Sequence, residues 1–176
     1  MKTSIYIAIS TNGLISNSRN VPDWLSPEYG QGMYSICQQF KAVIMGKTTY
    51  DIIAPDYLPL KDDGITIVLT THEDEKPANP TVNFTKAEPA EIIQRLADEG
   101  YEQAVIIGGT MTISQFIKAG LVDDIYLIVE PVLFDGGLPL LKDVARDLKL
   151  NLVDVAKLNA NTVQLHYQLL SVVAGG

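Results

Sequence analysis

The sequence is poor in cysteine and in basic residues. It has a single cysteine, Cys37, so no disulfide can form within the chain and no cluster of cysteines can hold zinc. Such low cysteine usage is typical of a reducing compartment and predicts a cytoplasmic protein. With 13 Lys and Arg against 21 Asp and Glu, the net charge is -8. An acidic protein repels phosphate backbones at long range, which argues against nucleic acid and anionic membranes as partners.

Several sequence signatures are also missing. No apolar run approaches the length that spans a bilayer, and the first residues lack the apolar core and cleavage site of a signal peptide. The Gly-x-Gly-x-x-Gly dinucleotide fingerprint is absent. Gly46-Lys47-Thr48 does not complete a kinase-type P-loop, because that pattern requires a glycine where Lys41 stands. The two histidines, His72 and His166, are isolated, so we predict no metal site.

The bulk composition predicts a folded domain. The chain has 176 residues, of which 47% are hydrophobic and 19% are charged. This length suits one domain, and this hydrophobic content allows a sizeable core. We therefore expect residues 1–176 to form a single domain, with a frayed tail at about 171–176.

Apolar runs alternate with helical patterns along the chain. Strands are expected at 3–10, 42–45, 65–69, 104–107 and 124–130. The three middle runs are continuously apolar, which is typical of parallel strands that are covered on both faces by helices. In such a sheet, ligands bind outside the carboxyl ends of the strands.

Helices and a hairpin complete the expected α/β fold. Ser26-Pro27-Glu28 has the composition of a helix start, and this helix is expected to reach about Phe40. The other expected elements are a loop over 11–26, helices over 88–99 and 110–119, and a hairpin made of 148–156 and 162–169. The sequence thus predicts a mostly parallel twisted sheet of about eight strands, with helices on both faces and a C-terminal antiparallel hairpin.

Two glycine turns follow buried strands and open helices. Gly108-Gly109-Thr110 is one, and Gly46-Lys47-Thr48 is the other. Glycine allows a sharp turn and a close approach of phosphate, and a helix N-terminus presents free N–H groups with partial positive charge. Two such turns suggest one extended phosphate-bearing ligand across the strand ends. The alternative is a pair of tight turns with no ligand, in which Lys47 is a solvated surface lysine.

Five segments, in the right order, resemble known reductases. Residues 43–50 (Val-Ile-Met-Gly-Lys-Thr-Thr-Tyr) and 106–109 (Ile-Ile-Gly-Gly) resemble the two cofactor segments of dihydrofolate reductases. Residues 9–16, 120–125 and 131–137 resemble segments of the reductase domain of bifunctional riboflavin-biosynthesis proteins. The resemblance implies a dihydrofolate-reductase-like fold that holds NADPH along the strand ends, and a short single-domain relative of the riboflavin-pathway reductase domain.

The resemblance also implies a set of cofactor residues. The phosphates of NADPH would meet Gly46, Lys47, Thr48, Gly108, Gly109, Thr110 and Met111. The adenosine ribose and its extra phosphate would lie at Thr70 and Thr71. The nicotinamide would lie near Ala8, Ile15 and Ser16.

The sequence departs from both families on the substrate side. Dihydrofolate reductases hold the folate carboxylate with an arginine before the third strand, but residues 60–64 (Leu-Lys-Asp-Asp-Gly) have none. Ile128 stands where that family has a threonine that faces the pterin. The opening aspartate of the riboflavin-pathway domain is replaced by Asn12, and only Arg19 is basic in the segment with which that domain holds a ribose phosphate.

Six further residues are candidates for substrate binding and catalysis. Glu28, at the helix start, is the candidate proton donor, and the alternative is a glutamate that faces solvent. Trp24 and Tyr50 either stack on a flat ring or pack in the core or a lid. Glu130 ends a strand and faces either the substrate or the surface. The remaining candidates are Ser10 and Asn12, near the end of the first strand.

Three functional hypotheses follow. The first is an NADPH-dependent reductase that acts on a small pterin- or pyrimidine-like heterocycle, similar to 5-amino-6-(5-phosphoribosylamino)uracil reductase, with dihydrofolate reductase itself as the alternative. The second is an NADPH-binding module without catalysis, and the third is an oligomeric protein without a ligand. The resemblance implies a homodimer, with the hydrophobic 121–141 and 162–170 segments as candidate surfaces.

Overall fold

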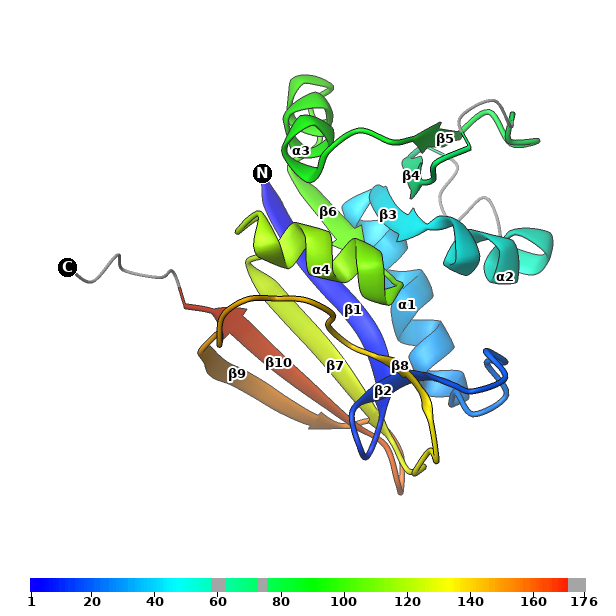
Figure 1. The fold of residues 1–176 in the computed structure, drawn as a ribbon, viewed down its shortest axis with the longest axis vertical. Helices are drawn as coiled ribbons and strands as arrows, with labels where there is room; N and C mark the ends of the chain where they lie inside the picture. Colours follow the sequence, from blue (N-terminus) through cyan, green and yellow to red (C-terminus); the bar gives the residue numbers. More distant parts are fainter. Residues whose placement is uncertain (58–62, 73–75, 171–176) are drawn as a thin grey trace.

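The computed structural model describes residues 1–57, 63–72 and 76–170, and it places ten strands and four helices there (Figure 1). The main sheet has eight strands in the order β5-β4-β3-β6-β1-β7-β10-β9. These strands are β1 (Lys2–Ser10), β3 (Ala42–Gly46), β4 (Ile65–Leu69), β5 (Val82–Thr85), β6 (Gln103–Ile106), β7 (Asp124–Glu130), β9 (Leu150–Lys157) and β10 (Val163–Leu169).

The strand directions confirm the predicted architecture. The six strands from β5 to β7 run parallel, whereas β10 is antiparallel to both β7 and β9. Tyr6 pairs with Tyr126 and Ala8 with Ile128, so β1 lies in the centre of the sheet between β6 and β7. The carboxyl ends of β1, β3, β4 and β6 therefore meet at one edge.

Four helices cover both faces of the sheet: α1 (Pro27–Phe40), α2 (Lys47–Tyr57), α3 (Pro89–Asp98) and α4 (Thr110–Lys118). On one face, Ile92 and Leu96 of α3 and Phe116 of α4 pack in the same cluster as Ile5 of β1. On the other face, Tyr29 of α1 packs in a cluster with side chains of β1, β3, β6 and β7. Burial of these apolar side chains on both faces supplies most of the driving force for folding.

The start of α1 follows the expected capping chemistry. Ser26 is the N-cap, and its Oγ accepts a hydrogen bond from the Tyr29 N–H at 3.2 Å. Pro27 occupies the first turn, where its missing N–H costs nothing. Glycine suits position 32 inside the helix because a Cβ there would clash with the Tyr6 hydroxyl.

A second, two-stranded sheet lies beside the main one, and the sequence did not predict it. It pairs β2 (Leu14–Asn17) with β8 (Gly137–Pro139), within what was expected to be a loop over 11–26. The prediction of an irregular segment was wrong at residues 14–17, because β2 is short and pairs with a segment far away in the sequence. It is confirmed at 11–13 and 18–26, which lie outside helices and strands. Among the helices of the described ranges, none is long and apolar enough to cross a membrane.

A buried carboxylate ties together three strands at the opposite end of the sheet from the glycine turns. Asp124, at the start of β7, lies 2.9 Å from Lys2 Nζ and 2.6 Å from His166 Nε2. Burial by itself raises the pKa of the Asp124 carboxyl, but the hydrogen bonds from Lys2 and His166 outweigh it and hold that pKa below its usual range. The folded state therefore favours the charged carboxylate, and it links β1, β7 and β10.

We predict that Asp124→Asn lowers the free energy of unfolding by about 2 kcal/mol at pH 7, because a buried charge-assisted interaction is lost. Since the folded-state pKa is below the unfolded one, this stabilisation is complete at neutral pH and disappears as the pH falls below about 4. Urea unfolding between pH 3 and pH 7 measures both effects. Asp63→Asn, at the exposed Lys41–Asp63 ion pair, is the control and should change little. Equal pH profiles for wild type and Asp124→Asn would contradict the prediction.

Candidate active site

Two cavities meet at the carboxyl ends of the parallel strands. One, of about 780 Å³, is lined by the ends of β3 and β4 and by the N-termini of α2 and α4; we call it the anion cavity. The other, of about 790 Å³, is lined by β1, α1 and α2 and by the segment that leads into α1; we call it the ring cavity. Both are bordered by Ile15, Ser16 and Asn20, so they form one continuous cleft.

The anion cavity is built on the two glycine turns. The Gly46 N–H donates to the Gly108 carbonyl oxygen at 2.9 Å, which joins the ends of β3 and β6. A Cβ at Gly46 would lie 2.9 Å from Thr112 Oγ1, and Gly108 has a φ of +135°. Both positions therefore need glycine, one for close approach and the other for its backbone conformation. The peptide bond between Gly108 and Gly109 is cis.

Two helix N-termini open into this cavity. Gly46, Lys47 and Thr48 line it at the start of α2, and Gly109, Thr110 and Met111 line it at the start of α4. Gly109 is the N-cap of α4 and offers no side chain to cap the first N–H groups. Uncapped N–H groups and the helix dipole together favour an anion at this position.

The side chains around these termini add cationic and hydroxyl groups. Lys47, Lys86 and Lys142 line the cavity, as do Thr70, Thr71 and His72 at the end of β4. Glu88 is the one carboxylate in the lining among the described residues. Lys47 Nζ lies 2.8 Å from Asp51 Oδ1, so part of its charge is already compensated. In a chain of net charge -8, three lysines around one cavity are a local concentration of positive charge.

The structure brings the predicted cofactor residues together. The members that line the anion cavity are Ile15, Ser16, Gly46, Lys47, Thr48, Thr70, Thr71, Gly109, Thr110 and Met111. Ala8 lines the ring cavity, and Gly108 lies under the turn rather than in the lining. The roles assigned to these residues stay predictions, but residues far apart in the sequence meet where one extended ligand would need them.

The ring cavity has apolar and neutral polar walls. Trp24 and Leu25 line it from the segment before α1, Tyr29 and Met33 from α1, and Ile52 from α2. Tyr29 is buried, and its ring stacks on Tyr6 with centroids 5.5 Å apart. Burial raises the pKa of the Tyr29 phenol above its usual range, so this hydroxyl remains protonated at neutral pH.

Of the substrate candidates, Trp24 lies in the lining of the ring cavity. It also packs edge-on against Phe134, with centroids 5.1 Å apart. Tyr50 instead packs edge-on against Phe84 at 5.1 Å and lines neither cavity. Ser10 and Asn12 are also outside the two linings.

Ser10 and Asn12 hold the loop after β1. Ser10 Oγ donates to Asn12 Oδ1 at 2.8 Å and accepts from the Leu14 N–H at 3.0 Å. Asn12 Nδ2 donates a hydrogen bond to the Phe134 carbonyl oxygen at 2.9 Å, and Asn12 Oδ1 accepts one from the Phe134 N–H at 3.2 Å. This pair therefore fixes the segment that carries Phe134, which in turn packs on Trp24.

Glu28 faces away from the ring cavity. Asn159 Nδ2, in the loop between β9 and β10, donates to Glu28 Oε2 at 2.9 Å. This hydrogen bond lowers the pKa of the Glu28 carboxyl, whereas a proton donor at neutral pH needs a raised pKa. The structure thus does not bring Glu28 to the lining of either cavity, and its catalytic role stays a prediction.

Glu130 is neither on the surface nor in the lining. Its side chain is 1% exposed, at the end of β7. Oε1 accepts from the N–H and the Oγ of Ser26, at 3.0 and 2.7 Å, and Oε2 accepts from Thr162 Oγ1 at 2.9 Å. Ser26 lines the ring cavity, so Glu130 lies directly behind its wall and fixes the start of α1.

Sequence reasoning missed most of the ring cavity. Tyr29, Met33, Ile52 and Ile53 line it but carried no motif, because apolar and aromatic residues on a helix equally well face a core. Gly30 was the residue of the sequence that could have indicated this cavity. A glycine inside a helix costs stability, and a Cβ at this position would meet nothing within 4 Å, so it opens onto the cavity.

Lys61, in the segment where an arginine was sought, lies outside the described residues.

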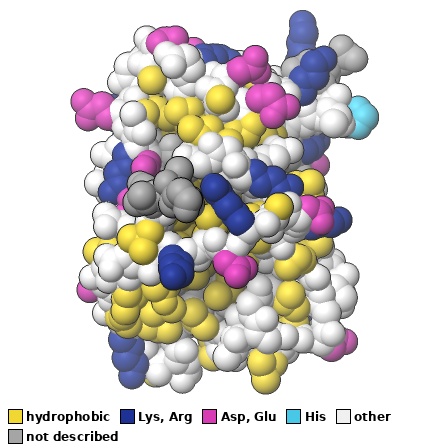
Figure 2. Space-filling model, turned by 60° about the vertical axis from the view of Figure 1, so that its left-hand side comes forward, with side chains coloured by type: hydrophobic (Ala, Val, Ile, Leu, Met, Phe, Trp, Pro, Cys, Tyr) yellow, Lys and Arg dark blue, Asp and Glu magenta, His cyan; other side chains and the backbone are white. Residues whose placement is uncertain are grey.

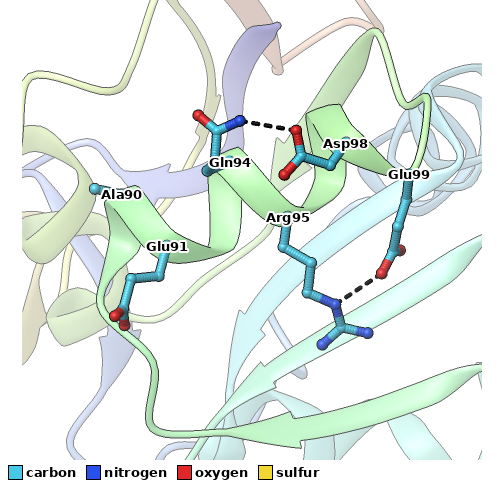
Figure 3. Close-up of a pocket in the computed structure, with 6 residues that line it drawn as sticks. All are labelled: Ala90, Glu91, Gln94, Arg95, Asp98 and Glu99. Carbon is cyan, nitrogen blue, oxygen red and sulfur yellow. Dashed lines mark hydrogen bonds and ion pairs between the residues drawn. The ribbon is translucent and has the colours of Figure 1, made fainter.

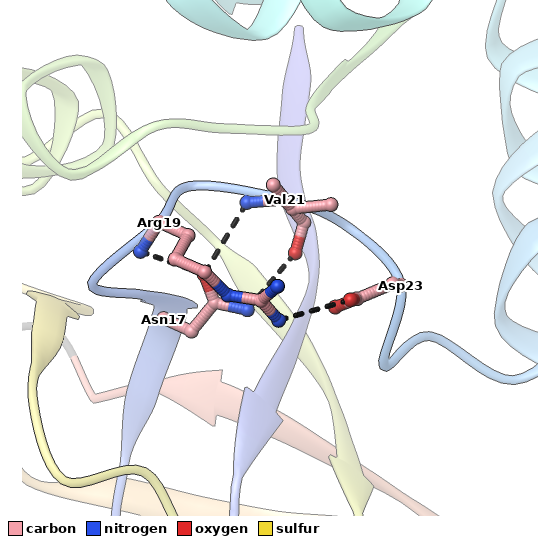
Figure 4. Close-up of polar contacts among 4 residues, drawn as sticks. All are labelled: Asn17, Arg19, Val21 and Asp23. Carbon is pink, nitrogen blue, oxygen red and sulfur yellow. Dashed lines mark hydrogen bonds and ion pairs between the residues drawn. The ribbon is translucent and has the colours of Figure 1, made fainter.

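Two polar surfaces outside the linings of these cavities have side chains that pair with each other. Arg19 Nη2 pairs with Asp23 Oδ2 at 3.0 Å, and Asn17 closes the same loop through Arg19 and Val21 (Figure 4). A shallow hollow on the outer face of α3 has polar and charged side chains that pair along the helix (Figure 3). These pairs are Gln94–Asp98 and Arg95–Glu99, each at 2.8 Å.

We predict that Glu130→Ala lowers the free energy of unfolding by about 2 kcal/mol, since buried donors on Ser26 and Thr162 lose their acceptor. It should also shift the emission of Trp24, the single tryptophan, because the segment before α1 loses its anchor. Thr162→Val is the matched control, since it removes the hairpin contact and leaves both Ser26 bonds in place. Identical emission spectra for the two variants would disprove a role of Glu130 in positioning the cavity wall.

Comparison with known proteins places this geometry in a family. Residues 4–164 match the RibD C-terminal domain family. A Bacillus subtilis (strain 168) protein, YwjB, which is described as uncharacterized, is 30% identical over 172 residues, covering 94% of this chain and 97% of its own.

Solved structures agree in fold. A Shewanella sp. PV-4 protein whose name ties it to riboflavin biosynthesis superposes with a TM-score of 0.82 at 23% identity, covering 97% of this chain and 100% of its own. A Thermotoga maritima diaminohydroxyphosphoribosylaminopyrimidine deaminase and 5-amino-6-(5-phosphoribosylamino)uracil reductase superposes with a TM-score of 0.76 at 16% identity. The match covers 96% of this chain and 56% of that protein. The Enterococcus faecalis dihydrofolate reductase complexed with NADP(H) gives 0.71 at 20%, over 96% of each chain. With the family match across most of its length, the chain belongs to the RibD C-terminal domain family, on a dihydrofolate-reductase-like fold.

Proposed function

We propose that this protein is an NADPH-dependent reductase of a small heterocycle. The observation that carries the proposal is the continuous cleft, in which an anion cavity at two helix N-termini opens into an aromatic, apolar ring cavity. A dinucleotide has the same division, with phosphates in its middle and a flat nicotinamide at one end. Family membership and the two reductases among the structural neighbours, one of them with NADP(H), support the same proposal.

Within this proposal, each cavity has a distinct task. The N-termini of α2 and α4 would bind the pyrophosphate, and the lysines around them would favour the additional phosphate of NADPH over NADH. Ile15 and Ser16 stand where the cavities meet, so the nicotinamide would lie there. When bound, the cofactor supplies a hydride to an electron-poor ring. The chain's own residues would hold that ring flat and exclude water.

The proton needed for reduction would come from water or from a neutral donor in the ring cavity. Tyr29 carries a buried hydroxyl in that lining, which is protonated at neutral pH. Apart from Tyr29 and Tyr34, the described lining of the ring cavity holds no titratable side chain. This favours, as the second candidate function, an NADPH-binding module with slow or no turnover. Steady-state oxidation of NADPH with heterocyclic acceptors distinguishes the two.

We predict that Gly109→Asp weakens NADPH binding at least tenfold. Its φ of -100° suits an aspartate, which would cap α4 and keep the fold, while its charge would repel the phosphates. Gly109→Asn is the matched control, because it has the same shape without the charge. Titration followed by nicotinamide fluorescence, with NADH in parallel, measures the effect. If neither dinucleotide binds to the wild type, or if both variants bind equally, the cofactor site is wrong.

We further propose that the protein is a homodimer, formed through the β9 edge of the sheet. Leu152, Val153 and Val155 are each about half exposed on this edge strand. Figure 2 brings this side of the molecule forward and shows hydrophobic side chains gathered on its lower part. An unpaired apolar edge is a liability for a monomer, and a second copy would cover it.

The dimer prediction is tested by sedimentation velocity. The wild type is expected to sediment as a dimer, and Leu152→Lys as a monomer, because a charge in an apolar interface is costly to bury. Tyr34→Lys, at a half-exposed side chain of α1 outside every candidate dimer segment, is the control. A monomeric wild type would refute the proposal.

A further inference from the structure

We infer that the ring cavity takes a flat, unsaturated ring that carries no phosphate or carboxylate. The inference rests on the proposed function, which it deepens by naming the class of substrate. It separates this protein from an enzyme that must hold a phosphoribosyl or a folate-type substrate by its negative charge.

The walls of the ring cavity carry the argument. All of its lining side chains among the described residues are apolar or neutral, and they include Trp24, Tyr29, Met33, Tyr34 and Ile52. Moving an anionic group from water into such surroundings is unfavourable unless a cation or strong donors compensate the lost hydration. A planar uncharged ring instead gains from contact with apolar and aromatic side chains.

A buried carboxylate lies next to the ring cavity. The Glu130 carboxylate lies behind the wall, bonded to Ser26, and is almost completely buried. Ser26 Oγ also accepts a hydrogen bond from the Tyr29 N–H, so this backbone donor at the start of α1 is not available to an anion. Charges in a region of low dielectric interact over longer distances than in water, so Glu130 disfavours an anion in the ring cavity.

Two cations near the ring cavity, Arg19 and Lys47, form ion pairs with other side chains. Arg19 precedes the lining residue Asn20, but its guanidinium is paired with Asp23 on the exposed side of the loop (Figure 4). Lys47 lines the anion cavity, where its ammonium pairs with Asp51 and lies 5.7 Å from the centre of the Tyr50 ring. Positive charge is thus concentrated at the cofactor end of the cleft, and the described lining of the ring cavity is neutral.

The test uses two probes of nearly equal shape, 4-nitrobenzamide and 4-nitrobenzoate, which differ by one negative charge. Binding to the protein without cofactor is followed by quenching of Trp24, which lies in the lining and is the single tryptophan. We expect the amide to bind at least tenfold more tightly than the carboxylate. Equal or tighter binding of the carboxylate, or no binding of the amide, overturns the inference.

Three variants locate and explain the preference. Gly30→Leu should abolish amide binding, because its side chain enters open space at the cavity. Ile52→Lys should strengthen the binding of 4-nitrobenzoate, because it places a cation in the lining. Arg19→Gln should leave both affinities unchanged. If Gly30→Leu binds the amide normally, or if Arg19→Gln alters the preference, the inference is wrong.

NADPH titration of the same samples separates the inference from the proposed function. Loss of the charge preference with normal NADPH binding overturns only the inference. Failure of NADPH to bind, with the charge preference intact, overturns the reductase proposal and leaves a neutral ring-binding cavity.

Discussion

The hydrogen bond from the Gly46 N–H to the Gly108 carbonyl oxygen joins two strand ends that are separated by sixty residues of chain. Because of this contact, α2 and α4 begin side by side, and their N-terminal N–H groups face one cavity. A Cβ at Gly46 would press on Thr112, and the φ of Gly108 is rarely adopted by other residues. The anion cavity thus depends on two glycines that contribute no side chain, and the cleft beyond it depends on the same alignment.

The ring cavity depends on a different constraint, which comes from the C-terminal hairpin. Glu130 ends β7, holds Ser26 at the start of α1 and accepts a bond from Thr162 at the start of β10. Asn159, in the loop between β9 and β10, reaches Glu28 in the first turn of the same helix. One wall of the cavity is therefore anchored to strands that do not themselves line it. A variant in the hairpin can alter the cavity without contacting a ligand.

The two ends of the cleft differ in the chemistry that they favour. Lysines, threonines and helix N-termini surround the anion cavity, whereas apolar and aromatic side chains surround the ring cavity. The net charge of -8 gave no indication of this division, because a global sum does not report where the charges lie. Under the proposed function, the phosphates in the middle of the dinucleotide would lie in the anion cavity, and its flat nicotinamide would lie where the two cavities meet.

The sequence by itself determined the parallel sheet, the cap of α1 and the glycine turns, because each depends on neighbouring residues: continuous apolar runs, Ser26-Pro27 and Gly108-Gly109. Only the tertiary structure decided the direction of the carboxylates and of the aromatic rings. Glu28 and Glu130 were both predicted at the site, yet one bonds to Asn159 and the other is buried behind Ser26. β2 pairs with β8, which lies more than a hundred residues further along the chain. These outcomes depend on partners more than a hundred residues away, which no local pattern specifies.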